Sequence, residues 1–517
     1  MNNYLSEGQS VFHVLFDTTE KQINQFLTYC YERNQTIYST KELMAVFNYK
    51  TSKLLSVIQQ VELFQEQYSE YTVNYQSESK TIKIEFSPRF LLSKVYAILV
   101  ERTVGFTFLD LLFKGKYHSL EQLSQETYSS LRTIQRKLTE LNQVLANYHL
   151  SYSLRKGNPL EGKEYYIRYF YHVMYWQLFD ETDSDLLATI RDKQTIATQI
   201  ERHAPYMRKI DCNKFLSLLA ISLQRIKQRH FIVEIPDEIT TFEHPLMTKR
   251  KFTECILAPF FQANVYAVSD LTDEEISFLY FMFAVMNTYL EEDLTEIHQN
   301  WFDNEQYSTE EIIIDKLSAY FDLALTSKEK NYLLVNLLMI HSYSSVFGTE
   351  HKIDGFGKQT RESELEAYFP VMYPTMRRFL IAIKREIPPL VGFAKKNDRL
   401  IFQYCMLVRT VFIKYERPVT FSIQSKFDKT QELWIKNRLL NTSHRAIQHV
   451  PSVDEPDILI SDYPIYRQLG ANKQMEIFYW NGQPTSSDWE RLKEKIHKIR
   501  SEKHKQVFDS LSFHQFS

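Results

Sequence analysis

The chain has 517 residues, 44% of them hydrophobic and 24% charged, with a formal net charge of -3. Its 11 glycines and 15 prolines make up about 5% of the residues, against about 12% in average usage, while aromatic residues reach 14%. Because few glycines allow few tight turns and few phosphate-binding loops, this composition disfavours a large α/β nucleotide-binding enzyme. We expect a mainly α, multi-domain protein with roughly three to five domains.

The cellular compartment can be inferred from a few sequence features. The first ten residues are polar, so no signal peptide is visible. The longest apolar run, residues 278–286, is about half as long as a membrane span. Four cysteines are far apart and form no CxxC pair: Cys30, Cys212, Cys255 and Cys405. We therefore expect a cytoplasmic protein with reduced cysteines, no membrane span and no metal site.

Residues 1–86 contain three helical patterns followed by two alternating ones. The spacing of apolar residues predicts helices over 20–31, 40–47 and 51–64 and strands over 71–75 and 81–86. Ser39 and Glu42 form a capping box at the start of the second helix, and Asn48, which tolerates left-handed backbone, ends it. This order predicts a winged helix-turn-helix domain. Its third helix begins with polar residues that either face DNA or simply start a helix: Lys50, Thr51 and Lys53.

The same order recurs over residues 87–163. The predicted elements are helices over 95–103, 106–113, 120–126 and 130–148, a strand over 150–154 and a return strand through Leu160. Ser119 caps the helix over 120–126 with Gln122 in the box position, and Ser129 caps the long helix. The long helix has an apolar stripe that we expect to point inward: Leu131, Ile134, Leu138, Leu141 and Leu145.

Two helices joined by a short turn, the second with a polar outer face, are typical of a helix-turn-helix motif that reads base edges. From residue 129 to 168 seven cations stand against three anions, a balance of +4 in a chain of net charge -3. An ordinary amphipathic helix with a solvated face explains the spacing equally well. The candidate DNA-binding residues lie in the long helix and its wing: Ser129, Arg132, Thr133, Arg136, Lys137, Arg155 and Lys156.

Two blocks of similar helical layout fill the middle of the chain. Their predicted helices lie over residues 194–202, 215–225 and 276–289 and again over 311–323, 332–341 and 399–415. Such a repeat implies two copies of one all-helical domain, over residues 164–290 and 291–415. The helix over 165–176 is rich in aromatic residues and is more often part of a core than a cofactor site.

The junction between the wing and this aromatic helix, from Gly157 to Arg168, resembles the G-x-x-L-x-G-x-E-x-x-x-R junction of regulators with phosphotransferase-regulated (PRD) domains. In its domain order the chain is similar to the Mga/AtxA family of transcriptional regulators of Gram-positive bacteria. The resemblance implies a regulator that binds double-stranded DNA as a homodimer or higher oligomer and has no cofactor. It also implies a phosphocarrier of the sugar phosphotransferase system as a partner.

Members of this family are controlled by phosphorylation of histidines in their PRD domains, a charge change that can repack an interface. The position that the resemblance indicates, seven residues before Arg225, is Leu218 in this chain. Two other histidines are candidates, His203 before Ala204-Pro205 and His341 at a helix end. For such residues a capping or partly buried structural role is the commoner one. The sequence leaves open whether phosphorylation controls this chain.

Residues 416–517 alternate strands and helices. The predicted strands are 418–423, 457–460 and 475–479, with helices over 430–440 and 486–508. This order indicates a small parallel α/β domain. It resembles the EIIB domain of sugar phosphotransferase permeases, whose active loop carries a phosphorylatable cysteine after the first strand. Here the loop over 422–429 has neither cysteine nor glycine, so we expect dimerisation or docking in place of phosphotransfer.

Enzyme motifs do not support a catalytic function. The sequence has no HExxH, no G-x-S-x-G and no His/Cys cluster with metal-ligand spacing. The stronger alternative to a DNA-binding regulator is a non-DNA-binding signalling or scaffold protein that docks phosphotransferase components. The balance of +4 over residues 129–168 favours the regulator, because a scaffold has no need of a basic module.

Overall fold

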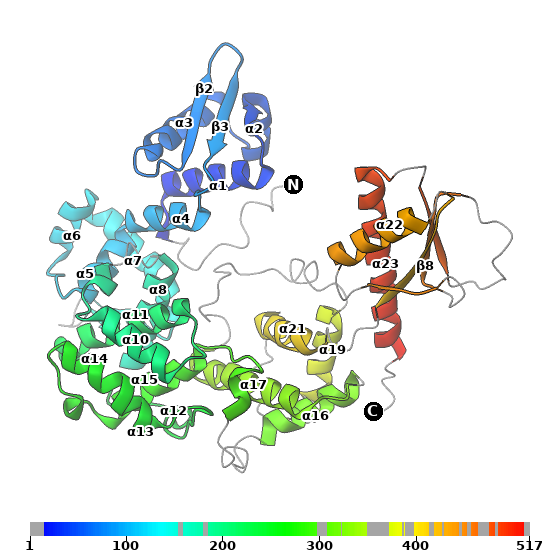
Figure 1. Ribbon diagram of the computed structural model, residues 1–517. Coiled ribbons are helices and arrows are strands. Elements are labelled where there is room, and N and C mark those ends of the chain that lie inside the picture. Colours follow the sequence, from blue (N-terminus) through cyan, green and yellow to red (C-terminus); the bar gives the residue numbers. More distant parts are fainter. Residues whose placement is uncertain are drawn as a thin grey trace. The chain divides into compact units, whose positions relative to one another are not determined.

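The computed structural model describes residues 15–153, 159–178, 185–296, 308–321, 323–348, 372–384, 387, 398–412, 418–426, 429–443, 447–451, 456–463, 475–480 and 484–510. Among them helices prevail over a few small sheets, which confirms the mainly α composition (Figure 1). The chain divides into two compact units, the first formed by residues 1–303 and 338–361 and the second by residues 304–337 and 362–517.

The first unit begins with a winged helix. Its elements are α1 (Thr18–Arg33), β1 (Ile37–Ser39), α2 (Thr40–Phe47), α3 (Thr51–Gln65), β2 (Tyr71–Gln76) and β3 (Thr81–Phe86). The strands form an antiparallel sheet in the order β1-β3-β2, with the β2–β3 hairpin as the wing (Figure 1). The predicted helices and hairpin are confirmed. The strand β1 was not predicted, because three residues are too few to show an alternating pattern.

A second helix-turn-helix unit follows. Its elements are α4 (Leu92–Glu101), α5 (Val104–Phe113), α6 (Leu120–Thr127), α7 (Leu131–Ala146), β4 (Ser151–Tyr152) and β5 (Leu160–Glu161). The helices α5, α6 and α7 pack together, and the β4–β5 hairpin forms the base of the wing. The predicted helices are confirmed, but the predicted strand over 150–154 is shorter, and residues 154–158 lie outside the described residues.

Gly162 makes the turn from this wing into the next helix. Its φ is +150°, and a Cβ at this position would lie 2.3 Å from Cδ2 of Leu150 and 3.2 Å from the His149 carbonyl oxygen. Both the backbone and the close approach therefore require glycine here.

Helices form the rest of the first unit. They are α8 (Glu164–Leu178), α9 (Asp185–Ala188), α10 (Lys193–His203), α11 (Lys209–Lys227), α12 (Asp237–Thr240), α13 (Lys249–Phe252), the π-helical turn η2 (Thr253–Leu257), α14 (Ala258–Ala263) and α15 (Asp273–Val285), with short 3-10 turns at Val268–Asp270 and Asp293–Glu296. The aromatic helix is α8. The ring of its buried Tyr171 lies 4.8 Å from that of Phe113 on α5, and the ring of Tyr169 lies 4.0 Å from that of Phe347. The helix therefore belongs to the core, as predicted.

The second unit holds α16 (Ser308–Tyr320), the first part of α17 (Ser327–Phe347), α19 (Met372–Ile383) and α21 (Asp398–Phe412). The ring of Phe321 contacts those of Phe379 on α19 and Phe412 on α21, at centroid distances of 6.1 and 5.9 Å. The predicted helices of both blocks are present. That the two blocks are copies of one domain stays a prediction.

The second unit also contains a parallel α/β fold. Its elements are β6 (Val419–Gln424), α22 (Lys429–Ser443), β7 (Ile447–His449), β8 (Ile458–Ser461), β9 (Glu476–Tyr479) and α23 (Ser486–Ser510). The strand order is β7-β6-β8-β9 (Figure 1). Ile435 of α22 and Leu492 of α23 pack with Phe421 of β6 in one apolar core. The predicted alternation of strands and helices is present, with the short strand β7 added.

Two further observations concern the chemistry of the chain. In the part that the structure describes, no helix is both long and apolar enough to span a bilayer. The described residues also form no group of three or more His, Cys, Asp or Glu side chains that could hold a metal ion. The four cysteines are free thiols, and Cys255 is the least buried of them.

Candidate nucleic-acid interface

The first helices of both helix-turn-helix motifs begin with the serine N-caps predicted from the sequence. Ser39 accepts a hydrogen bond from the Glu42 N–H at 3.1 Å, and Ser119 accepts one from the Gln122 N–H at 3.2 Å. The Gln122 side chain accepts in turn from the His118 N–H at 2.8 Å, one residue before the usual partner. These bonds determine where α2 and α6, the first helices of the two motifs, begin.

The turns of the two motifs follow the same backbone course. α2 ends at Asn48 (φ 54°) and α6 at Tyr128 (φ 49°), both in the left-handed region. In each turn the next residue donates its N–H to the carbonyl five positions back, at 3.0 Å in the first motif and 3.2 Å in the second. Two residues after the left-handed one, Lys50 and Ser130 stand at the N-caps of α3 and α7. The motifs can therefore be compared position by position.

The long helix α7 begins one residue later than predicted, at Leu131. Its N-cap is Ser130, whose Oγ accepts a hydrogen bond from the Thr133 N–H at 3.2 Å, so the prediction that Ser129 caps this helix is wrong. The Ser129 hydroxyl donates to the Thr127 carbonyl at 3.1 Å. Two adjacent serines fit a capping pattern equally well, and the course of the turn decides which of them faces the helix end.

The outer face of α7 carries side chains that can reach base edges. Its exposed residues are Leu131, Arg132, Gln135, Arg136, Thr139, Gln143 and Ala146. Arg132 forms no ion pair within the described part of the chain. The Arg136 guanidinium, 61% exposed, lies 3.2 Å from the Glu140 carboxylate, an exposed pair that solvent and salt weaken. Gln135 was missed in the sequence, although its helical spacing from Arg132 places it on the same face.

Lys137 does not lie on this face, so its predicted place beside Arg136 on the outer side of the helix is wrong. It is only 4% exposed, and its Nζ lies 2.6 Å from Oδ1 of Asp17, 3.2 Å from Oε2 of Glu140 and 3.4 Å from the Phe16 carbonyl oxygen. The matching position in α3 is the core residue Val57. The aliphatic part of the lysine thus takes an apolar core position while its ammonium group meets two carboxylates.

The inward stripe of α7 differs accordingly from the predicted one. Leu131, predicted to point inward, is 42% exposed. The buried residues are Ile134, Lys137, Leu138, Leu141, Val144 and Leu145.

The net charge of residues 129–168 therefore overstates the basic surface. Lys137 and Arg168 are buried in ion pairs. Arg155 and Lys156 of the wing lie outside the described residues. The exposed cations that the structure describes in this stretch are Arg132, Arg136 and Lys163.

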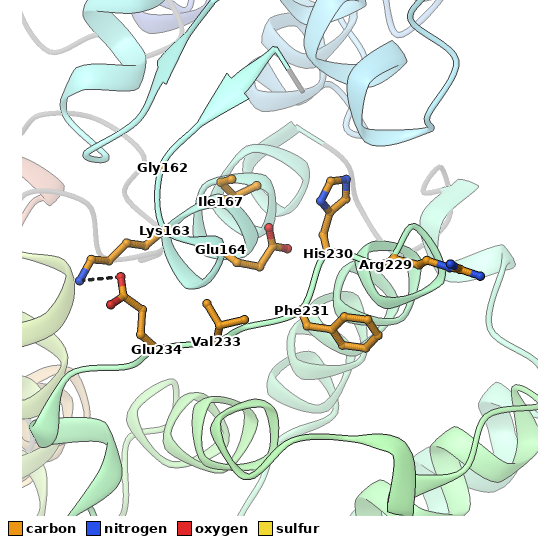
Figure 2. Close-up of a pocket in the computed structure, with 9 residues that line it drawn as sticks. All are labelled: Gly162, Lys163, Glu164, Ile167, Arg229, His230, Phe231, Val233 and Glu234. Carbon is orange, nitrogen blue, oxygen red and sulfur yellow. Dashed lines mark ion pairs between the residues drawn. The ribbon is translucent and has the colours of Figure 1, made fainter. Parts of the chain in front are cut away.

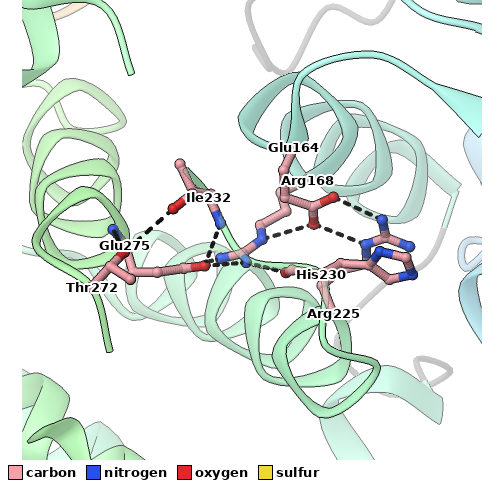
Figure 3. A network of polar contacts seen from close by, with 7 residues as sticks. All are labelled: Glu164, Arg168, Arg225, His230, Ile232, Thr272 and Glu275. Carbon is pink, nitrogen blue, oxygen red and sulfur yellow. Dashed lines mark hydrogen bonds and ion pairs between the residues drawn. The ribbon is translucent and has the colours of Figure 1, made fainter. Parts of the chain in front are cut away.

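A buried ion network lies at the junction that carries the family resemblance (Figure 3). Arg168 of α8 is fully buried and donates two hydrogen bonds to Glu275 of α15, one of them from Nη2 to Oε1 at 2.6 Å. Glu164 accepts from Nε of Arg168 at 3.1 Å and from Nε and Nη2 of Arg225 on α11 at 2.9 and 2.7 Å. Arg168 also donates to the His230 carbonyl at 3.0 Å. The E-x-x-x-R part of the junction thus holds α8, the helix that directly follows the wing, against α11 and α15.

A hollow of about 590 Å³ opens beside this network (Figure 2). It is lined by Gly162, Lys163, Glu164, Ile167, Arg229, His230, Phe231, Val233 and Glu234. The exposed side chains of Lys163 and Glu234 form an ion pair, with Nζ 3.2 Å from Oε1. Burial lowers the pKa of His230, with nearby Arg225 acting in the same direction. The lining mixes both charges with apolar groups and indicates no particular ligand.

The candidate residues of the first motif lie at the start of α3. Lys50, Thr51 and Lys53 are all exposed. The Thr51 hydroxyl contacts the Met44 sulfur at 3.3 Å. These positions match those at the start of α7 in the second motif.

The two candidate histidines differ in access. His203 ends α10 and is half-buried. His341 lies well inside α17 and is 5% exposed, so its prediction as a helix-end residue is wrong. Leu218, at the position where the resemblance indicates histidine, is fully buried in α11.

Acidic side chains occupy the end of the parallel sheet. The strand order changes direction between β6 and β8, the place where open α/β sheets bind ligands. There the Asp462 carboxylate accepts hydrogen bonds from the Ser425 hydroxyl at 2.8 Å and the Lys426 N–H at 2.7 Å. Glu432 accepts from the Ser425 N–H at 3.0 Å. Carboxylates of the chain itself thus occupy donors that an anion would need.

Comparison with known protein families gives a match in the second helix-turn-helix motif and its surroundings. Residues 88–175 match the family model of the Mga helix-turn-helix domain. No curated protein matches the chain. The matched segment runs from just before α4 into α8 and contains the whole α6–turn–α7 motif with its wing. This match indicates a DNA-binding regulator and identifies residues 88–175 as an Mga helix-turn-helix domain, which supports the resemblance of the chain to the Mga/AtxA family.

Proposed function

We propose that the chain is a transcriptional regulator that binds promoter DNA as a homodimer and reads the major groove with α7. The observation that carries this proposal is the outer face of α7, where Arg132, Gln135 and Arg136 are exposed within the matched domain. An arginine pairs with the O6 and N7 atoms of guanine, and a glutamine with the N6 and N7 atoms of adenine. The wing residues Arg155 and Lys156 would then contact phosphates.

The first motif offers a second set of contacts. Lys50, Thr51 and Lys53 are exposed at the start of α3, the helix that corresponds to α7. The proposal includes a cytoplasmic location and no catalytic activity. A link to phosphotransferase signalling would act through His203, because the burial of His341 hides its ring from a phosphocarrier.

A mobility-shift titration at several salt concentrations tests the proposal. The double variant Arg132→Ala/Arg136→Ala should bind a selected promoter fragment at least about tenfold more weakly, because each base contact contributes about 1–3 kcal/mol. The matched control is Arg250→Ala/Lys251→Ala, which removes two exposed cations from α13, outside the matched domain. Control binding should equal that of the wild type. Unchanged affinity and salt dependence in the α7 variant would rule out this helix as the reading element.

A signalling or scaffold protein remains the second candidate. It is favoured by the burial of Lys137 and Arg168 in ion pairs, which leaves fewer exposed cations in the stretch than the sequence suggests. The same titration separates the two functions, since a scaffold would show no retardation of promoter DNA at low salt.

A further inference from the structure

Two apolar side chains are exposed at the tip of the second helix-turn-helix motif. Tyr128, in the turn, is 98% exposed, and Leu131, the first residue of α7, is 42% exposed. They lie on either side of Ser129 and Ser130, and Leu131 shares the exposed face of α7 with Arg132 and Gln135. The matching positions of the first motif are polar, Asn48 and Thr51 in α2–turn–α3.

The fold itself does not favour tyrosine at position 128. The residue has φ 49°, where a side chain with a Cβ is strained and glycine or asparagine is preferred. The first motif has asparagine at this point, with φ 54°. The almost complete exposure of the tyrosine also means that its ring contributes little to the core. A tyrosine that is unfavourable for the backbone and absent from the core is best explained by a contact outside the chain.

We propose that Tyr128 and Leu131 bind thymine methyl groups in the major groove, next to the bases read by Arg132 and Gln135. Thymine is the base that presents a methyl group there, and apolar side chains recognise it. The N-terminal residues of a recognition helix contact the base edges, and the turn that holds Tyr128 directly precedes them. This inference rests on the proposed function, and it adds a preference for thymine that the polar residues alone would not produce.

The test replaces thymine by deoxyuracil, which lacks only the methyl group. A duplex selected by the full-length wild-type chain is compared with copies in which single thymines are replaced. At the positions read by Tyr128 or Leu131, wild-type affinity should fall about fourfold, the value for burying one methyl-sized group. The variants Tyr128→Asn and Leu131→Ala should bind the thymine duplex more weakly and lose this sensitivity to deoxyuracil.

A stability measurement excludes misfolding as the cause. Tyr128→Asn copies the residue of the first motif and relieves a strained backbone, so its melting temperature should equal or exceed that of the wild type. Weaker binding together with equal or higher stability is the expected result. The salt dependence of binding should not change, because neither variant removes a charge.

Several results would overturn the inference. One is a pair of variants that bind both duplexes as the wild type does. Another is an equal loss of affinity on both duplexes, which would place the side chains on the sugar-phosphate backbone. A change in oligomeric state without a change in thymine preference would instead assign this patch to contacts between copies of the chain. If the wild type binds no DNA at all, the proposed function fails as well, and that result is distinct from a wild type that binds both duplexes equally.

Discussion

His244 shows how a single buried residue can make stability depend on pH. Its Nδ1 accepts hydrogen bonds from the N–H groups of Leu246 at 2.9 Å and Met247 at 3.2 Å, and its Nε2 lies 2.8 Å from the Tyr289 hydroxyl. Burial lowers the pKa of His244 to about 3. The neutral ring is thus the form that the fold accommodates.

We expect stability to fall as the pH drops below the usual histidine pKa of about 6.5. The unfolded chain takes up the proton first, and the folded chain does so only near pH 3, so the stability from the neutral ring is complete above about pH 6.5 and declines below it. Between pH 7.5 and 5.5 this residue should account for a loss of about 1.4 kcal/mol in the free energy of unfolding. The free energy of unfolding is measured by urea denaturation at both pH values. It should fall less between pH 7.5 and 5.5 for His244→Gln than for the wild type.

A neighbouring variant provides the control for this prediction. Met247→Ala leaves the imidazole in place and should lower stability equally at both pH values. His172, whose pKa burial also lowers, keeps part of the pH dependence in every variant. An unchanged decline in His244→Gln would show that His244 is protonated equally in the folded and unfolded chain.

At the scale of the element, two adjacent serines at the start of α7 have different roles that the sequence does not distinguish. Ser130 accepts from the Thr133 N–H, whereas the Ser129 hydroxyl bonds within the turn. Removing a capping side chain costs about 1 kcal/mol. Ser130→Ala should therefore lower the free energy of unfolding by about this amount, and Ser129→Ala by clearly less, in urea denaturation. The reverse order would place the cap at Ser129.

The helices and their caps were the most predictable part of the fold. The elements α2, α3, α6 and β3 were recognised because an apolar period and a cap or turn residue coincided in each. The strands β1 and β7 were missed, since each has three residues and pairs only with strands distant in sequence. The face of α7 was predicted in part. Arg132 and Arg136 are exposed as expected. Lys137 was assigned to the outer face because it is charged, although it belongs to the buried stripe.

At the scale of the whole molecule, the segment before α1 packs on the second helix-turn-helix unit. Leu15 and Phe16 are buried, and the Phe16 ring lies 5.1 Å from that of Tyr96 on α4. A Cβ on Gly105 of α5 would lie 2.7 Å from the Leu15 side chain. The Asp17–Lys137 ion pair adds a polar contact to this packing. Residues 15–17, predicted as part of the first domain, thus help to join it to the second.

This joint predicts two different effects for changes at Lys137. Lys137→Ala leaves the carboxylates of Asp17 and Glu140 without their cation. Because these carboxylates are 47% and 31% exposed and can regain water, we expect a loss of about 2 kcal/mol in unfolding free energy, less than for a fully buried pair. Lys137→Met should cost less, since an apolar side chain of similar length suits the position that Val57 has in α3.

DNA binding checks the placement of Lys137 independently. Because its ammonium group points into the joint, Lys137→Met should keep the salt dependence of the wild type, whereas the loss of a phosphate contact lowers the slope by about one. A lower slope for Lys137→Met, measured by titration at several salt concentrations, would mean that this lysine contacts phosphate.

The sequence by itself determined the helical class, the two helix-turn-helix patterns and the junction that identifies the family resemblance. These features depend on periods, caps and turn residues, which act between neighbours in the chain. Only the tertiary structure decided which cations are exposed and which apolar residues are not buried. Lys137 meets Asp17, and Arg168 meets Glu275, across long sequence separations, whereas Tyr128 and Leu131 stay exposed within the described part of the chain. The pattern of charge and hydropathy along a chain does not indicate such partners, because partner residues meet only when distant segments fold onto one another.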